Sequence, residues 1–420
     1  MSILSDLRSL TAKQRSAVVA SYLGWTLDAF DFFIMVFVLK HIATEFNTDV
    51  KSTAFAITLT LAMRPIGALV FGLAADRFGR RPTLMVDVLL YSILEFASGF
   101  APSLTVLLLL RALYGIAMGG EWGVGASLTM ETIPPKTRGI ISGLLQAGYP
   151  TGYLLASVVF GLLYDHIGWR GMFMIGAVPA LLVLYIRRQV DESPAFVARQ
   201  HVKSRPSVLT VVRRQFGLLI YAVLLMTAFN FFSHGTQDLY PTFLEVQHEF
   251  STQTVSWIAI VYNIGAIVGG LGFGALSEKI GRRKAIIIAA VLALPVIPLW
   301  AYASTPVLLA VGAFLMQVAV QGAWGVIPVH LNELSPDEIR GTFPGVAYQL
   351  GNLLASVNAT LQAGLAESHN NDYAFALALV AGIVAVAVIV LTGLGKEARG
   401  VIFGVNAAEP PAKQAEMRGT

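Results

Sequence analysis

Long apolar stretches alternate with short polar ones along the whole chain. A helix of about 20 mostly apolar residues is long enough to cross the hydrocarbon core of a bilayer. Twelve stretches of this kind lie at 18–40, 53–75, 84–101, 103–130, 139–161, 169–187, 216–240, 254–276, 284–302, 306–330, 341–363 and 373–394. Inside a bilayer only helices and closed barrels satisfy their backbone groups, and barrel strands are much shorter than these stretches. We therefore predict an all-α membrane protein with twelve transmembrane helices.

Charged residues are scarce, and their distribution is asymmetric. They make up 13% of the 420 residues, whereas a soluble domain carries about 25%. If the N-terminus lies in the cytoplasm, 24 of the 29 Lys and Arg residues fall on the cytoplasmic side, as the positive-inside rule requires. The net charge of +4 therefore indicates orientation rather than a nucleic-acid partner. We predict two cytoplasmic termini, and the compact loops and short tails favour a bacterial inner membrane.

One motif recurs at a fixed offset along the chain. GLAADRFGRR at 72–81 returns as GALSEKIGRR at 274–283, and the same offset of 202 residues maps Glu131 onto Glu333. Separate matches in one register indicate an internal duplication, and two such halves are typical of secondary transporters. We predict a six-helix half at 1–187, a cytoplasmic linker at 188–215, a second six-helix half at 216–394 and a cytoplasmic tail at 395–420. The tail is rich in Ala, Pro and charge, and we expect it to be disordered.

The repeated motif also resembles a known family. GxxxDRxGRR after the second helix, its weaker copy after the eighth, and LLLLRALYG at 107–115 resemble signatures of the major facilitator superfamily over nearly the whole chain. The resemblance implies the two-half fold of that superfamily, and a monomer. Charged residues around both copies could latch the halves together in one state, although anchoring by positive charge is an alternative. The predicted gating residues are Gly72, Asp76, Arg77, Arg80, Arg81, Glu131, Arg138, Glu278, Arg282, Glu333 and Arg340.

Charges inside predicted membrane helices are the next candidates, since a charge at a helix centre costs about 2.5–3.5 kcal/mol on insertion scales. Counting residues along each helix places Asp28 and Arg64 near the midplane, and Asp31 and Arg111 at one level further out. The side chains of Asp31 and Arg111 could therefore face each other. A buried carboxylate whose arginine partner moves away would take up a proton, so Asp28, Asp31 and Arg111 are predicted to couple protons to transport. A static ion pair is the alternative, and for Glu95 we favour a packing role.

The seventh apolar stretch contains FNFFSHGTQDLYPTF at 229–243, with four polar residues at spacings i, i+4, i+7 and i+8. They are Asn230, His234, Gln237 and Asp238. At 100° per residue these side chains form one polar face of the helix. Interhelical hydrogen bonds, each worth about 0.6 kcal/mol, could account for the amides. They do not require a His and an Asp one turn apart, so we predict a substrate site here, with Asp238 in proton coupling.

A narrower resemblance rests on the same stretch. NFFSHGTQDLYPT fits, at every defined position, the pattern N-x-x-[ST]-H-x-[ST]-Q-D-x-x-x-T of lactate and pyruvate permeases in the sialate:proton symporter family. An arginine before the glycine-rich end of helix two and a Gln-x-x-Asn pair in helix eleven are further features of that family. The resemblance implies substrate recognition by Arg64, Asn230, His234, Gln237, Gln349 and Asn352. An arginine can bind a carboxylate bidentately, which suits a small monocarboxylate anion.

These features predict a proton-coupled symporter that imports a small monocarboxylate, such as lactate or pyruvate, by alternating access. Sialic acid import is the nearest alternative, because sialate transporters belong to the same broader family. Drug export is disfavoured because GYPTGY at 148–153 departs from the antiporter pattern. With no cysteine, no GxxxxGK[ST] loop and no convincing HExxH or GxSxG motif, we expect no cofactor, no metal, no ATP and no enzymatic activity. The expected partners are the acid, protons and the lipid bilayer.

Overall fold

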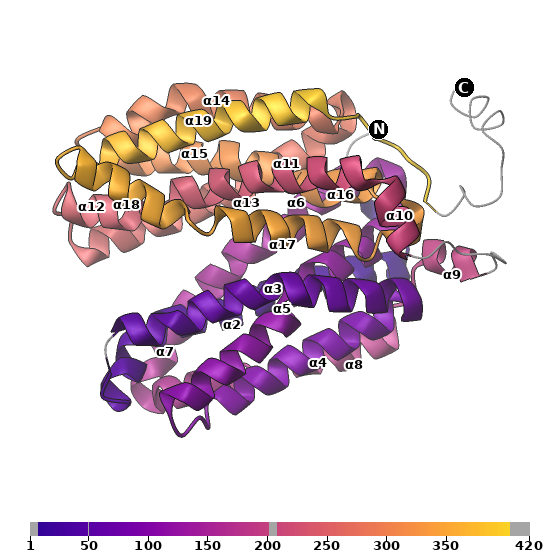
Figure 1. The fold of residues 1–420 in the computed structure, drawn as a ribbon, viewed down its shortest axis with the longest axis horizontal. Helices are drawn as coiled ribbons and strands as arrows, with labels where there is room; N and C mark the ends of the chain where they lie inside the picture. Colours follow the sequence, from indigo (N-terminus) through magenta and orange to yellow (C-terminus); the bar gives the residue numbers. More distant parts are fainter. Residues whose placement is uncertain (1–6, 49, 201–207, 404–420) are drawn as a thin grey trace.

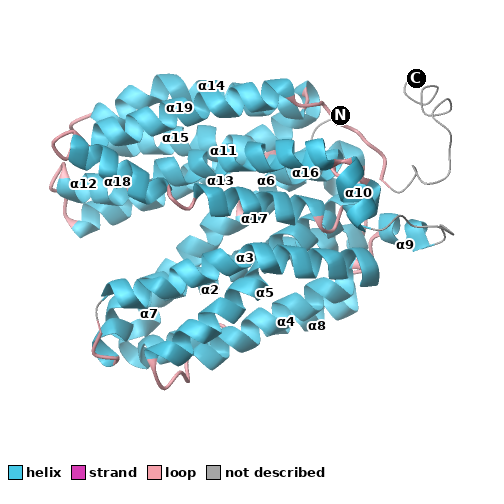
Figure 2. Cartoon of the chain, viewed as in Figure 1, coloured by secondary structure: helices cyan, strands magenta, loops and turns pink. Residues whose placement is uncertain are grey.

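The computed structural model describes residues 7–48, 50–200 and 208–403, and these form helices joined by loops (Figure 2). The chain folds into two helical bundles (Figure 1). The short helices α9 (Pro194–Gln200) and α10 (Val208–Arg214) belong to the segment between the bundles and lie at one end of the molecule, here called the linker end. Residues 201–207 of the predicted linker and 404–420 of the predicted tail lie outside the described residues.

The first bundle is formed by the N-terminal part of the chain. Its helices are α2 (Ala12–Glu45), α3 (Val50–Phe78), α4 (Arg80–Ser98), α5 (Leu104–Thr132), α6 (Arg138–Gln146), α7 (Gly148–Ile175) and α8 (Ala180–Gln189). Polar side chains cap the N-termini of several of these helices. The Ser103 side chain, for example, accepts a hydrogen bond from the backbone N–H of Val106 at the beginning of α5, which satisfies one of the free donors of a helix N-terminus.

The second bundle repeats this plan. Its helices are α11 (Phe216–Gln237), α12 (Tyr240–Val246), α13 (Thr252–Ile280), α14 (Arg282–Tyr302), α15 (Pro306–Gly325), α16 (Ile327–Leu334), α17 (Phe343–Ala355), α18 (Asn358–Ser368) and α19 (Tyr373–Leu394). At the start of α15 the side chain of Thr305 accepts a hydrogen bond from Leu308. Thr305 lies 202 residues after Ser103, so the duplication extends to the caps of equivalent helices.

Nine helical stretches in the described residues are long and apolar enough to cross a membrane. The three other predicted spans are formed by α4, by the end of α7 with α8, and by α17 with α18. The prediction of an all-α membrane protein with twelve transmembrane helices is confirmed. Leu109, Val307 and Ile383 are 63%, 72% and 61% exposed on the outside of the bundles. Apolar side chains on an outer surface suit contact with lipid rather than water.

Several predicted spans are divided into two helices, which hydrophobicity alone does not reveal. The stretch 216–240 breaks between α11 and α12 at Asp238, 306–330 breaks between α15 and α16, and 341–363 breaks between α17 and α18. The fifth and sixth spans run together in α7, where Gly168 turns the chain with a φ of 62°. Broken membrane helices are tolerated where they line a cavity or pack inside the protein, and they are common around transport sites.

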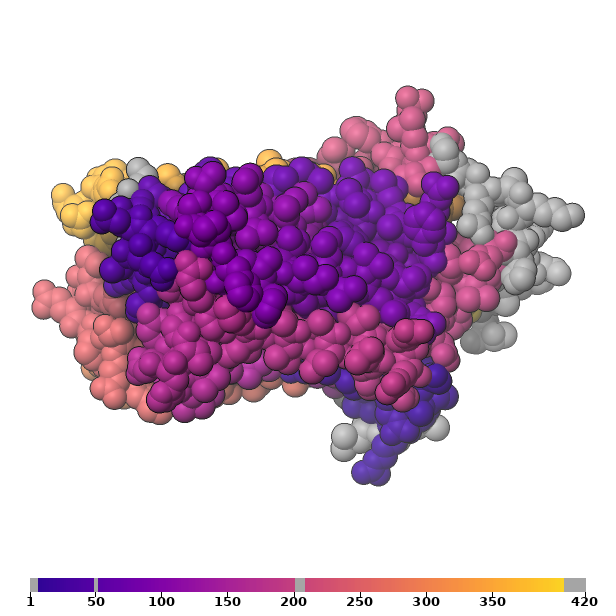
Figure 3. Space-filling view, turned by 90° about the horizontal axis from the view of Figure 1, so that it is seen from below, coloured from indigo at the N-terminus to yellow at the C-terminus, as the bar shows by residue number. Residues whose placement is uncertain are grey.

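The two bundles are in close contact at the linker end, where α6 packs on α13 and α3 packs on α17. A Cβ atom built on Gly143 of α6 would lie 2.2 Å from the carbonyl oxygen of Gly270 in α13. One built on Gly72 of α3 would lie 2.6 Å from Cα of Thr342. Only glycine permits backbones this close. The N-terminal half covers most of the face seen in Figure 3, and residues near the linker project at one end of it.

Candidate functional site

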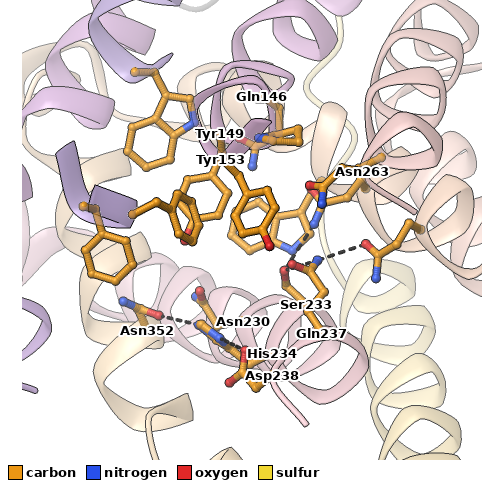
Figure 4. Close-up of a pocket in the computed structure, with 18 of the residues that line it drawn as sticks. Gln146, Tyr149, Tyr153, Asn230, Ser233, His234, Gln237, Asp238, Asn263 and Asn352 are labelled. Atoms are coloured by element: carbon orange, nitrogen blue, oxygen red, sulfur yellow. Dashed lines mark hydrogen bonds and ion pairs between the residues drawn. The ribbon is translucent and has the colours of Figure 1, made fainter. Parts of the chain in front are cut away.

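A cavity of about 290 Å³ lies between the two bundles and is lined from both (Figure 4). The first half contributes, among others, Trp25, Arg64, Gln146, Tyr149 and Tyr153. The second half contributes, among others, Asn230, Ser233, His234, Gln237, Asp238, Asn263, Gln317, Gln321, Tyr348 and Asn352. Five of the six predicted substrate residues therefore line one cavity, and the sixth, Gln349, lies beside Arg64.

Arg64 is a nearly buried cation in the cavity wall. It is 3% exposed, and its guanidinium carbon lies 5.9 Å from the ring centroid of Trp25 and 5.8 Å from that of Tyr348. When the amide oxygen of Gln349 faces the guanidinium, it accepts hydrogen bonds from Nε at 3.3 Å and from NH2 at 3.2 Å. No carboxylate forms an ion pair with Arg64 in the described part of the chain. Asp28 and Glu121 lie within electrostatic range of Arg64 but do not bond to it directly. A buried cation without a direct ion pair is unfavourable, so this wall favours an anion.

His234 connects two acceptor groups beside that wall. Its Nδ1 lies 3.1 Å from Oδ1 of Asp238, one turn further along the helix, and its Nε2 lies 3.0 Å from Oδ1 of Asn352 on α17. Figure 4 shows the ring between these two partners. Both neighbouring atoms are oxygens, and this geometry suits a ring that carries a proton on each nitrogen. His234 and Asp238 are about one-third exposed, at 32% and 35% of their side chains, so both reach solvent in the cavity.

A second hydrogen-bond network lies along the same helix and was not predicted from the sequence. Gln237 Nε2 donates to Oε1 of Gln317 at 2.9 Å and to Oγ of Ser233 at 3.2 Å. Gln321 Nε2 also donates to Ser233 Oγ, at 3.2 Å. Gln317 and Gln321 are spaced i, i+4 in the apolar stretch 306–330, and this spacing is the signal that could have identified them.

Asp31 and Arg111, which could have faced each other at one level, form no ion pair in the described part of the chain. Arg111 NH2 instead lies 2.6 Å from Oε2 of Glu95 and donates to Oγ of Ser98 at 2.7 Å. Residue counting gives the level of a side chain in the bilayer but not the direction in which it points, and α4 and α5 are packed neighbours that bring Glu95 to Arg111. Asp28 and Asp31 are fully buried, and their carboxylate oxygens have no hydrogen-bond partner among the described residues.

Asp76 joins the two halves at the linker end. Its Oδ1 accepts a hydrogen bond from the backbone N–H of Gly341 at 2.9 Å, and its Oδ2 accepts from N–H and Oγ1 of Thr342 at 2.9 and 2.7 Å. Arg80 holds Asp76 at 3.0 Å and donates to both oxygens of Glu131, each at 3.1 Å. The first half therefore presents a carboxylate, oriented by a buried arginine, to the backbone of the second half.

The same arrangement recurs in the second half with the roles exchanged. Glu278 accepts a hydrogen bond from the backbone N–H of Gly139 in the first half. Arg282 holds Glu278 at 3.1 Å and donates to the two oxygens of Glu333 at 3.0 and 3.2 Å. The 202-residue offset therefore relates two equivalent contacts, and each half supplies one carboxylate to the other.

Glu131 and Glu333 each face an arginine of the opposite half as well. Arg340 NH1 lies 3.9 Å from Oε1 of Glu131, and Arg138 NH1 lies 3.8 Å from Oε1 of Glu333. All four side chains are almost completely buried. Separation of the halves would remove one arginine from each glutamate, so these charges favour the closed linker end.

Arg77 and Arg81 do not take part in these contacts, although both were predicted as gating residues. Arg77 is exposed, and its guanidinium lies over the ring of Phe78 at 5.3 Å. Arg81 donates to the carbonyl oxygen of Arg187 within its own half. Each is next in sequence to a member of the Asp76–Arg80–Glu131 cluster, and neighbouring residues on a helix point about 100° apart.

Two glutamates that were not predicted cap the helices α4 and α14. Glu192 Oε1 accepts from the backbone N–H of Arg80 at 3.0 Å, and Glu397 accepts from Arg282 and Arg283 at 3.2 and 3.1 Å. A carboxylate at a helix N-terminus is stabilised by the helix dipole. Burial raises the pKa of the Glu192 carboxyl, and the backbone hydrogen bonds oppose that rise. Both residues follow the last helix of a half, which is the signal that could have identified them.

Residues 395–403 were expected to be disordered, and this expectation is wrong. The ring of Phe403 lies 3.7 Å from the guanidinium carbon of Arg138 and 3.9 Å from that of Arg340. Arg138 NH1 also donates to the carbonyl oxygen of Val401 at 2.7 Å. Because the two arginines belong to different halves, the start of the tail is bound to both by cation–π contacts and hydrogen bonding.

Comparison with known proteins identifies the family. A profile of the Major Facilitator Superfamily matches residues 18–251 and 223–413, which together cover most of the chain. The chain belongs to the Major Facilitator Superfamily. The two bundles described above are therefore the two halves of a Major Facilitator transporter, and the prediction of a transporter rather than an enzyme is confirmed.

Several relatives in this superfamily resemble the chain over most of its length. The carboxylic acid transporter protein homolog of Saccharomyces cerevisiae is 28% identical over 94% of this chain and 70% of its own length. The sialic acid transporter NanX of Escherichia coli K12 is 27% identical over 96% of this chain and 98% of its own. Among solved structures, the proton:xylose symporter XylE matches with a TM-score of 0.78 at 19% identity, covering 93% and 98% of the two chains. At that identity, XylE supports the Major Facilitator fold alone.

The glycine contact between α6 and α13 allows a direct test of how this Major Facilitator protein closes. A valine at Gly143 would place Cβ 2.2 Å from the Gly270 oxygen, so we expect Gly143→Val to prevent closure of the linker end and to abolish transport. Since the native chain has no cysteine, a single cysteine at Ala266, which lines the cavity, reports accessibility. The variant should react with a thiol reagent added from the linker side at least about tenfold faster than the parent.

Gly161→Val is the matched control, because a Cβ atom at Gly161 meets nothing within 4 Å. Its labelling rate and its transport should equal those of the parent. Equal labelling of the Gly143→Val protein and its parent would show that the close glycine contact does not govern closure.

Proposed function

We propose that the protein is a proton-coupled symporter that imports a small monocarboxylate, such as lactate or pyruvate, by alternating access of the two halves. The observation that carries this proposal is Arg64, a nearly buried cation in the cavity wall with no carboxylate partner in the described part of the chain. A carboxylate of the substrate would supply two parallel hydrogen bonds and the missing negative charge. The names of the yeast and Escherichia coli relatives support an organic acid as substrate.

Substrate recognition is proposed to combine this arginine with amide groups. Gln349 holds one edge of the Arg64 guanidinium, and Asn352 lies on the same helix one turn away and faces the cavity. Asn230 donates its Nδ2 to the carbonyl oxygen of Met226 at 2.7 Å, so its Oδ1 is the atom that could accept from a 2-hydroxyl group. Together these residues would bind a charged head and an adjacent hydroxyl.

Proton coupling is proposed to involve the His234–Asp238 pair and the buried acids of the first half. A proton on the pair would balance the charge of one bound monoanion, so that a cycle with one proton and one anion is electroneutral. Asp28 and Asp31 are fully buried without hydrogen-bond partners among the described residues, a condition that favours neutral carboxyl groups. Arg111 would influence them by keeping or leaving its ion pair with Glu95.

Alternating access is proposed to use the contacts at the linker end. Asp76 and Glu278, each held by a buried arginine, would release the opposite backbone when the halves rock apart. From the positive-inside rule we propose that the linker end lies in the cytoplasm, in which case the conformation described here is closed on that side. We further propose a bacterial inner-membrane protein, supported by the Escherichia coli relative NanX, that acts as a monomer, as the superfamily resemblance implies.

The first test is uptake of radiolabelled L-lactate into proteoliposomes under an inward proton gradient. We expect saturable uptake that an uncoupler abolishes. Uptake that ignores the gradient would overturn the proton-coupled mechanism. Sialic acid is the second candidate, because NanX is 27% identical over nearly the full length of both chains. If sialic acid accumulates under the gradient and lactate does not, the coupling stands and the substrate assignment changes.

Removing the acid of the proton pair should separate binding from coupling. Asp238→Asn keeps the size of the side chain but cannot take up a proton, so we expect concentrative uptake driven by the proton gradient to fall at least about tenfold. Counterflow exchange of the same acid, which needs no net proton movement, should fall much less. Equal losses in the two assays would argue that Asp238 positions substrate instead of carrying the proton.

A further inference from the structure

The polar face of α11 is divided into two strips. Asn230, His234 and Asp238 form one strip, which meets Asn352 of α17 through His234. Ser233 and Gln237 form the other, and they stand next in sequence to His234 and Asp238. The first strip contacts α17 and the second contacts α15, so the two strips meet different walls of the same cavity. The second strip faces α15, as Figure 4 illustrates for Ser233 and Gln237.

The second strip belongs to a cluster of uncharged hydrogen-bonding groups. Gln237 and Ser233 are bonded to Gln317 and Gln321 of α15, as described above, and Gln317 Nε2 donates further to Thr236 Oγ1 at 3.3 Å. Asn263 of α13 lines the cavity as well. Asp238, His234 and Arg64 are the titratable or charged side chains other than tyrosine in the described cavity lining, and none of the three is hydrogen-bonded to this cluster.

Some hydrogen-bonding capacity of the cluster remains available. Asn263 donates its Nδ2 to the carbonyl oxygen of Ala259 at 2.9 Å, and Gln321 donates its Nε2 to Ser233. No hydrogen bond to Oδ1 of Asn263 or to Oε1 of Gln321 is found within the described residues, and both side chains line the cavity. An amide that uses its nitrogen within the protein and leaves its oxygen in a cavity can accept a hydrogen bond from a ligand.

The cluster and Arg64 occupy different walls. Arg64 belongs to α3, which packs across the boundary on α17, whereas Gln317 and Gln321 belong to α15, which packs on α13 and α14. The cavity has a volume of about 290 Å³, which is enough for several waters. A three-carbon acid has six non-hydrogen atoms and would leave space for several waters next to the arginine. A longer acid could reach both walls.

We propose that Ser233, Gln237, Asn263, Gln317 and Gln321 form a second substrate pole, which selects monocarboxylates that carry an uncharged hydrogen-bonding group, such as a hydroxyl, away from the carboxylate. The proposal rests on the proposed function, because it takes Arg64 as the anchor of the carboxylate. Of the five residues, Ser233 and Gln237 lie on α11 within the motif described above. Asn263, Gln317 and Gln321 extend the site to α13 and α15.

Two classes of acid are disfavoured by this pole. A dicarboxylate would place its second charge where the cluster offers no cation, and a buried charge without a partner is unfavourable. An alkyl acid would replace water at Asn263 and Gln321 without forming hydrogen bonds, so the free amide oxygens would lose their partners. A hydroxyl group donates to those oxygens, and it avoids both penalties.

The test is direct binding to the purified full chain by isothermal titration calorimetry, with butyrate, 4-hydroxybutyrate and succinate as probes. The wild type should bind 4-hydroxybutyrate at least about tenfold more tightly than butyrate, and succinate more weakly than either. Gln317→Leu and Gln321→Leu should reduce the preference for the hydroxyl compound to about threefold or less. Butyrate should bind these variants at least as tightly as it binds the wild type, because leucine leaves no amide without a partner. Gln253→Leu, an exposed glutamine at the start of α13, is the control and should keep the wild-type ratio.

The outcomes separate the two proposals. Equal binding of butyrate and 4-hydroxybutyrate by the wild type would overturn the second pole and leave a monocarboxylate site at Arg64. An unchanged preference in both α15 variants would overturn the assignment of these glutamines. If none of the three acids binds, the second pole is overturned, and the proposed function is decided separately by L-lactate uptake. Butyrate binding that is retained or tighter in the variants shows that they are folded, so a lost preference reports the pole itself.

Discussion

Replacing Arg64 with alanine should reduce the transport efficiency for the substrate acid by roughly 30- to 3000-fold, which corresponds to a loss of about 2–5 kcal/mol. The reason is that Arg64 is nearly buried, lines the cavity and has no carboxylate partner within the described residues. Without it, the carboxylate of the substrate would enter the site with no counter-charge. The measurement is initial-rate uptake into proteoliposomes over a range of acid concentrations, with protein incorporation determined for each variant.

Two control variants make this result specific. Arg64→Lys keeps the charge but loses the two parallel hydrogen bonds, so its transport efficiency should lie between those of the wild type and the alanine variant. Arg170→Ala removes an arginine that is paired with Glu45 outside the cavity lining and has a side chain 34% exposed, and this variant should keep wild-type efficiency. An alanine variant at Arg64 with normal efficiency would exclude this residue as the anchor.

Replacing Arg282 with alanine should lower the free energy of unfolding by about 3–5 kcal/mol. Arg282 is fully buried, binds both oxygens of Glu333 and also holds Glu278. Its removal leaves Glu333 buried, with Arg138 at 3.8 Å as the one remaining cation paired with it among the residues that the structure describes. Titration of the purified protein in mixed micelles with SDS, followed by tryptophan fluorescence, measures the change. Arg80→Ala should behave similarly, since it makes the equivalent contacts in the first half.

Arg77→Ala is the matched control for this experiment, because Arg77 is exposed at the same end of the molecule. It should change the free energy of unfolding by no more than about 0.5 kcal/mol. The double variant Arg282→Ala/Glu333→Gln removes the unpaired charge, so it should recover part of the loss. A double variant as unstable as the single one would show that packing of the arginine stem, rather than the orphaned glutamate, determines the loss.

The sequence was sufficient for features that repeat or that are local. The apolar stretches predict the helices, and the 202-residue offset predicts that Asp76 and Glu278 occupy equivalent places, as they do. The spacing of Asn230, His234 and Asp238 predicts a common helix face, because 3.6 residues form each turn. A linear pattern is informative here because the relevant geometry lies within one helix.

Contacts between helices required the structure. Counting residues assigned Asp31 and Arg111 to one level, but the side-chain direction depends on how each helix is rotated, and Arg111 pairs with Glu95. The glutamines of α15 escaped notice because two amides in an apolar helix carry no motif, and their role appears only when α11 lies opposite. The helix breaks near Asp238 and Val357 were missed because hydrophobicity continues through them.

The position of Phe403 between Arg138 and Arg340 has a consequence for biosynthesis. Residues 395–403 follow α19, so they leave the ribosome after all the described membrane helices. Both bundles must therefore be translated before this aromatic contact can form. A nascent chain arrested before Glu397 would contain every described membrane helix and yet lack the helix cap on α14 and the ring between the two arginines. The final shape of the linker end is thus set after translation of the membrane domain is complete.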